Sequence, residues 1–144
     1  MAAGLKSEPY SRDILRLAAS LPEAAFDDTS DARTTLRSDT CGSTIDLAAW
    51  TDSGTVKRLE AAVSACAYGQ AASALMLRHA PGQTVADVER ALIEIDDWLE
   101  GSDVIVPEWP GIEALAPARE RPGRHGAILL PFRALLRALQ EAVA

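Results

Sequence analysis

Apolar and polar positions change their spacing along the chain, and the changes divide it into a strand region between two helical regions. Residues 9–21 carry apolar side chains at helical spacing, and Pro22 is expected to end that helix. From residue 34 to residue 65 apolar and polar residues alternate, which is typical of strands with one buried face. Alternation stops at Cys66, and helical spacing returns after it.

The alternating region predicts three consecutive strands over residues 34–39, 44–50 and 55–65. The turn Asp52-Ser53-Gly54 has its glycine where a tight hairpin needs one. Consecutive strands with short turns form an antiparallel meander. The expected fold class is therefore α+β, a three-stranded antiparallel sheet covered by an N-terminal helix and by C-terminal helices.

The C-terminal part predicts three helices. The first spans residues 67–79, and the second starts at a capping pattern on Thr84 and ends before Gly101. Residues 102–111 form an irregular stretch. A last, strongly apolar helix is expected to hold Pro131 in its first turn, where proline is tolerated.

Length and charge narrow the possible functions. A chain of 144 residues suits one domain, and we expect residues 1–8 to be a disordered leader and residues 9–144 to form the domain. The net charge of -7 argues against nucleic acid as a partner. No apolar run approaches the roughly 20 residues that span a bilayer, and no signal peptide is evident, so we expect a cytoplasmic protein without a membrane partner.

The two cysteines are the first candidates for chemistry. They could be small buried residues, a redox pair or metal ligands, and composition alone favours burial. Antiparallel pairing places Thr44 opposite a residue near Ser64, which brings Cys41 and Cys66 together. Cys66 also precedes a helix, whose N-terminus favours thiolate. His125 could add a third ligand for zinc or an iron–sulfur centre, or it could be a loop histidine.

An arginine-rich loop is expected over residues 117–126, after a single helical turn that begins near Ile112. Its side chains Arg119, Arg121 and Arg124 are either a docking surface for a partner or simply a solvated, charged loop.

Four short motifs resemble a known family, and they follow one another with compatible gaps over residues 9–143. They are Tyr10-Ser11-x-x-Ile14, Cys41-Gly42, Ala65-Cys66-Ala67-x-Gly69-Gln70-Ala71-Ala72-Ser73, and Arg124-His125 before an apolar helix. The pattern resembles the U-type iron–sulfur cluster assembly scaffolds, which comprise the NifU N-terminal domain, IscU and SufU.

The resemblance implies a function and a ligand set. Members of the family bind a nascent [2Fe–2S] cluster or zinc through three cysteines, with help from an aspartate or a histidine. They take sulfur from a cysteine desulfurase and serve acceptor apoproteins. The implied metal ligands here are Cys41, Cys66 and His125. The third cysteine of the family falls at Gly126 on the IscU spacing or at Ala127 on the SufU spacing, and neither residue has a thiol.

The family's Cys-Gly-Asp turn is also altered, because Ser43 stands in place of the aspartate. Asp39 or Asp46 could compensate, and Asp39 and Ser43 are the candidate auxiliary residues. The expected function is a scaffold or carrier that binds iron, a [2Fe–2S] cluster or zinc with a reduced ligand set. The alternatives are a zinc-binding or persulfide-accepting relative, or an interaction domain without metal.

No enzymatic activity is expected. The sequence contains no nucleophile elbow, no HExxH pair and no phosphate-binding loop.

Overall fold

The structure, a computed structural model, describes residues 11–39 and 41–143. The expected leader, residues 1–8, lies outside these ranges, as do Pro9 and Tyr10. Within the described part of the chain, no helix has the length and apolar character needed to cross a membrane.

The sheet has the predicted architecture. Strands β1 (Ala32–Arg37), β2 (Thr44–Asp52) and β3 (Thr55–Ser64) pair antiparallel in the order β1-β2-β3. Ser53 and Gly54 both have positive φ angles, 52° and 81°, as a type I′ hairpin turn requires. The predicted α+β fold class is confirmed.

The start of the chain's second strand defines one end of this sheet. Arg37 pairs with Thr44, and Thr44 pairs with Ser64 on its other side. The first strand therefore ends at Arg37, two residues earlier than predicted, because Ser38 already belongs to the turn. Its N–H donates to the carbonyl of Ser43 over 2.8 Å.

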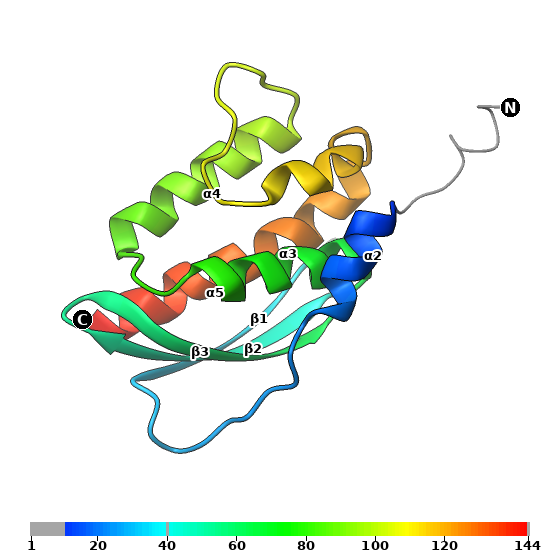
Figure 1. Ribbon diagram of the computed structural model, residues 1–144. Coiled ribbons are helices and arrows are strands. Elements are labelled where there is room, and N and C mark those ends of the chain that lie inside the picture. Colours follow the sequence, from blue (N-terminus) through cyan, green and yellow to red (C-terminus); the bar gives the residue numbers. More distant parts are fainter. Residues whose placement is uncertain (1–10, 40, 144) are drawn as a thin grey trace, which may run out of the picture.

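Helices cover one face of the sheet in two layers (Figure 1). Helices α3 (Ala67–His79) and α5 (His125–Val143) lie on the strands, α5 over β1 and β2 and α3 beside β3. Helix α2 (Arg12–Ala19) packs on α3, and α4 (Val85–Leu99) packs on α5. The capping box of α4 forms as predicted, with reciprocal hydrogen bonds between Thr84 and Asp87.

The region before α5 differs from the prediction of one helical turn and a loop. It folds as two 3-10 helices, η1 (Ile112–Glu120) and η2 (Pro122–Arg124). The residues of η1 that are buried are Ile112, Leu115 and Ala118, one in every three, which is the period of a 3-10 helix.

The start of α5 also differs from the prediction. The helix begins at His125, so Pro131 lies in its second turn and not in its first. Proline has no N–H, so Pro131 cannot bond the carbonyl of Ala127 four residues earlier.

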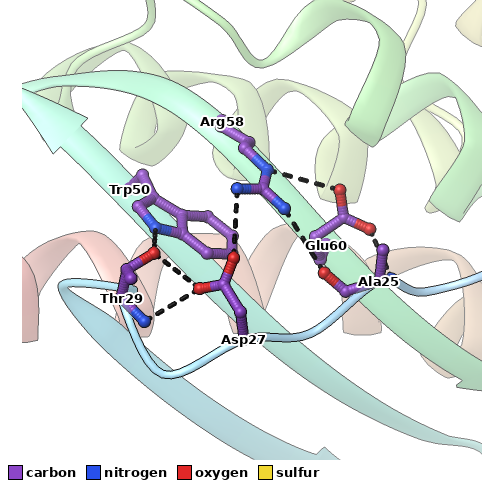
Figure 2. A network of polar contacts seen from close by, with 6 residues as sticks. All are labelled: Ala25, Asp27, Thr29, Trp50, Arg58 and Glu60. Carbon is purple, nitrogen blue, oxygen red and sulfur yellow. Dashed lines mark hydrogen bonds and ion pairs between the residues drawn. The ribbon is translucent and has the colours of Figure 1, made fainter.

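The opposite face of the sheet is crossed by the segment between α2 and β1 (Figure 2). The Arg58 guanidinium lies 4.0 Å from the centre of the Trp50 ring and 3.5 Å from the Glu60 carboxylate. Glu60 accepts a hydrogen bond from the Ala25 N–H over 2.7 Å, and Trp50 Nε1 donates to Thr29 Oγ1 over 2.9 Å. These contacts dock the segment on the sheet.

Candidate functional site

Both cysteines flank the same end of the sheet. The predicted register is confirmed, because Thr44 is paired with Ser64. Cys41 lies in the turn just before Thr44, and Cys66 lies just after Ser64. Cys41 is exposed and Cys66 is half-buried, and neither is in a disulfide.

The turn that carries Cys41 surrounds its sulfur with hydroxyl groups. Sγ of Cys41 lies 3.0 Å from Ser43 Oγ and donates to Ser38 Oγ over 3.4 Å. Gly42 adopts a φ of 72°, which lets the chain reverse. Ser43, one of the predicted auxiliary residues, thus contacts the thiol directly. Its hydroxyl supplies a polar contact but no negative charge.

Cys66 is the N-cap residue of α3, as the end of strand alternation predicts. Its backbone is extended, with φ −67° and ψ 173°, and its side chain makes no capping hydrogen bond. The N–H groups in the first turn of a helix have no partner within the helix, so they leave partial positive charge beside this sulfur. The sulfur is therefore placed where it could bind a metal ion or accept sulfur.

Gly69 brings the start of α3 against the start of α5. A Cβ added to Gly69 would lie 2.7 Å from Ala65 Cβ, 3.2 Å from Ala127 Cβ and 3.3 Å from the Ala127 carbonyl oxygen. This close approach places Cys66 and His125 on adjoining helix starts. It also shows why the family-like motif has glycine at this position.

That contact leads to a stability prediction. Gly69→Ala is expected to lower the free energy of unfolding by about 1–2 kcal/mol, because the overpacking cost of about 1–3 kcal/mol exceeds the helix propensity gained. Chemical denaturation measures this change in the free energy of unfolding. The double variant Ala65→Gly with Gly69→Ala removes the shortest clash, so it should lose less than the sum of its single variants. Simple additivity would contradict the close contact.

His125 is the first residue of α5 and not a loop histidine. It is 8% exposed, its Nε2 lies 2.8 Å from the Ala118 carbonyl oxygen, and its Nδ1 lies 3.8 Å from Glu100 Oε1. A carbonyl oxygen can only accept, so Nε2 carries a proton in this contact. In the neutral ring the lone pair is then on Nδ1, the atom nearer Glu100.

A polar cleft of about 530 Å³ opens beside His125, between the end of β1, helix α4 and the start of α5. Gly126 and Asp39, the second predicted auxiliary residue, also line it. Its other charged lining residues are Arg37, Asp96, Glu100 and Arg133. Ala127 is not part of the lining and is only 1% exposed. Of the two positions at which the family's third cysteine could fall, Gly126 is therefore the one that faces the cleft.

Glu100 and the Ala118 carbonyl are the functional candidates that the sequence analysis missed. Glu100 follows the apolar stripe of α4 and has the pattern of a solvated residue. Ala118 takes part only through its backbone carbonyl, which bonds the His125 ring. Ala118 reaches His125 because η1 folds against α4, and Glu100 reaches it because α4 packs on α5. Neither long-range contact has a local signal in the sequence.

The donors do not form a closed metal site. Among residues 11–39 and 41–143, no group of three or more histidine, cysteine, aspartate or glutamate side chains is placed so as to hold a metal ion. Cys41, Cys66 and His125 share one end of the fold without completing a ligand shell.

Asp46 points to the other face of the sheet, since it alternates with the buried Ile45 and Leu47. Its carboxylate makes two hydrogen bonds with Arg33, of 2.8 and 2.7 Å. The hydrogen bonds from Arg33 hold the pKa of Asp46 below its usual value, against a smaller opposing effect of burial. Asp46 is thus an ion-pair partner on the outer face and does not replace the missing aspartate.

The three arginines of the predicted docking surface differ in their surroundings. Arg119 donates from Nε to the Trp98 carbonyl over 2.8 Å and pairs with Asp103 at 2.8 Å, so it fastens the chain internally. Arg121 is exposed and Arg124 is half-buried. A docking role for the arginines stays a prediction, and Arg121 is the one most open to a partner.

Comparison with solved structures finds similar folds. A NifU-like protein (N-terminal) from Brucella abortus is 27% identical, with a TM-score of 0.84 over 92% of this chain and 93% of the other. A putative iron–sulfur cluster assembly scaffold protein for the SUF system from Fervidobacterium islandicum AW-1 is 19% identical, with a TM-score of 0.79 over 91% of this chain and 96% of the other. At 19% sequence identity, the similarity to the second protein shows only that the two chains share a fold.

No model of a known protein family matches the chain, and no curated protein does. The resemblance to the U-type scaffolds that the four motifs indicate is confirmed by the solved structures, and the chain has their fold.

Proposed function

We propose that this protein is a scaffold or carrier in iron–sulfur cluster assembly, and that it holds iron, a [2Fe–2S] cluster or zinc as cargo. The proposed ligands are Cys41, Cys66 and His125. The observation that carries the proposal is the pairing of Thr44 with Ser64, which sets both thiols at one end of a NifU-like sheet. The role is one of binding and transfer, without catalysis.

Each proposed ligand has surroundings that suit metal binding. Cys66 is half-buried beside the partial positive charge at the start of α3, and a cysteine binds metal through its sulfur. The Ala118 carbonyl orients the imidazole of His125, and metal-bound histidines commonly have such a partner on the other ring nitrogen. Cys41 lies in an exposed turn, so cargo can approach it from solvent.

The incomplete ligand set fits a transient holder. Two thiolates and one imidazole leave a coordination position for water, for a side chain of a partner or for a second subunit. Asp39 and Glu100 line the same cleft and add carboxylates to it. We propose that a cysteine desulfurase supplies sulfur and that acceptor apoproteins take the cargo, with Arg121 and Arg124 at the edge of that contact.

Anaerobic reconstitution tests this proposal. The purified protein is treated with ferrous iron and sulfide, and its metal content and visible spectrum are recorded. A scaffold is expected to show the bands of sulfide-to-iron charge transfer, weakened in Cys41→Ser, Cys66→Ser and His125→Ala. The chain offers a matched control, because His79, near the end of α3, is its other histidine. His79→Ala should keep the bands.

The other outcomes identify the alternatives. Zinc at about one per chain, without the iron bands, would instead support a zinc-binding or persulfide-accepting relative. Neither metal after reconstitution would leave an interaction domain on the scaffold fold and would refute the proposal.

A further inference from the structure

Two buried serine hydroxyls lie against the exposed thiol of Cys41. Ser38 is 8% exposed and Ser43 is 4% exposed, whereas Cys41 is open to solvent. The Cys41 sulfur lies 3.0 Å from Ser43 Oγ and 3.4 Å from Ser38 Oγ. We propose that Ser38 and Ser43 are positioning residues, which fix the direction of the Cys41 sulfur and donate hydrogen bonds to it when cargo is bound. The inference rests on the proposed function.

The backbone of the turn holds the two serines side by side. Arg37 pairs with Thr44 at the end of the ladder between β1 and β2, and Ser38 and Ser43 are the next residues on each strand. The Ser38 N–H donates to the Ser43 carbonyl over 2.8 Å, so the pairing continues by one residue beyond the strands. Both hydroxyls are therefore fixed at the base of the turn that carries the sulfur.

The two hydroxyls can bond the sulfur both before and after it binds a metal ion. As a thiol, Cys41 donates its proton to Ser38 Oγ. When a cysteine binds metal, this proton is released to solvent, and the sulfur is left only able to accept. A serine hydroxyl rotates to donate or to accept, so Ser38 and Ser43 can turn their protons toward the bound sulfur without a change in the backbone. Such hydrogen bonds orient a metal ligand and tune the metal.

A structural role alone does not account for this arrangement. Buried hydroxyls need partners, and serines in turns commonly bond nearby backbone groups. The buried Ser43 hydroxyl instead contacts Cys41 Sγ, which belongs to an exposed residue. Water could solvate an exposed thiol equally well, so the contact adds little to stability. Its consequence is that the direction of the sulfur is fixed before cargo arrives.

The hydroxyl pair also narrows the class of cargo. A carboxylate beside Cys41 would add a negative charge and an oxygen ligand, whereas the two hydroxyls are neutral and can donate to the sulfur. Binding at this turn then depends on the sulfur itself. Thiolate ligands suit zinc and iron–sulfur clusters, whereas carboxylate, carbonyl and water suit magnesium and calcium. The turn is therefore expected to bind thiophilic metals and to discriminate against magnesium and calcium.

Anaerobic titration of the purified chain with cobalt(II), a spectroscopic substitute for zinc, tests the inference. Cobalt thiolates absorb by charge transfer from sulfur to metal, and a hydrogen bond to the sulfur raises the energy of this band. Ser43→Ala is expected to shift the band to longer wavelength and to weaken cobalt binding about tenfold. Ser38→Ala should have a smaller effect of the same sign, because its contact is longer. Ser43→Thr keeps a hydroxyl and should retain the native band and Kd.

Two controls separate positioning from a general effect on the fold. Ser64→Ala removes an exposed hydroxyl at the same end of the sheet, and it should leave the band and the Kd unchanged. In the Cys41→Ser background, Ser43→Ala should change the Kd for cobalt by less than about twofold, because the sulfur that Ser43 contacts is gone.

The same samples distinguish failure of the inference from failure of the proposed function. A native band position and Kd in Ser43→Ala, or an equal loss of affinity with and without Cys41, would overturn the inference while the proposed function stands. Lower stability of the metal-free Ser43→Ala chain in chemical denaturation, without a shift of the band, would also overturn it, because the serine would then only close the turn. Absence of cobalt binding by the native chain would refute the proposed function and the inference with it.

Discussion

Gly126→Cys is expected to raise the affinity of the protein for zinc on the order of 100-fold. Structural zinc sites with four protein ligands bind with about 10–16 kcal/mol, so one added thiolate contributes about 3 kcal/mol. Gly126 lines the cleft beside His125 and Asp39, which Cys41 and Cys66 do not line, so a thiol at this position would add a sulfur next to the proposed ligand His125. Anaerobic competition against a chromophoric chelator measures the change in Kd.

Ala127→Cys is the matched control for this gain. Ala127 is buried, and its side chain lies against Gly69. A sulfur added there would crowd the contact between α3 and α5, so this variant should lose stability by about 1–3 kcal/mol and gain no affinity. Equal gains from both variants, or no gain from Gly126→Cys, would show that position 126 does not add a ligand to the proposed metal site.

The sequence alone predicts that the two cysteines lie at the same end of the sheet. The period of two in the strands and the short turns between them determine an antiparallel register, and that register alone places Thr44 opposite Ser64. The start of a helix at Cys66 can be predicted in the same way, because the alternation of apolar and polar residues stops there. Both features depend on local patterns, which a single sequence contains.

The surroundings of His125 could not be predicted in the same way. They depend on η1, whose buried positions repeat every third residue, and a search for helical spacing of 3.6 finds only one turn in that pattern. Without η1 there is no Ala118 carbonyl for the imidazole, and Glu100 approaches the imidazole only because α4 packs on α5. The chemistry of the cleft thus follows from long-range packing.

Trp109→Ala is expected to be strongly destabilising. The Trp109 ring packs edge-on against Phe132, with ring centres 5.1 Å apart and planes at 87°, and its Nε1 bonds the Leu75 carbonyl. Removing a buried tryptophan costs about 3–5 kcal/mol. For a chain of this size the Tm should fall by roughly 10 °C or more, which calorimetry measures.

Trp109→Phe separates ring packing from the hydrogen bond. Phenylalanine keeps one aromatic ring that can pack against Phe132 but loses the N–H and part of the indole volume, so it should cost about 1–3 kcal/mol, less than alanine. Because Trp109 also anchors the end of the segment that joins α4 to η1, Trp109→Ala should expose residues 102–108 to limited proteolysis, whereas Trp109→Phe should not. Equal losses of stability in the two variants would mean that the hydrogen bond to Leu75, and not ring packing, joins this segment to the core.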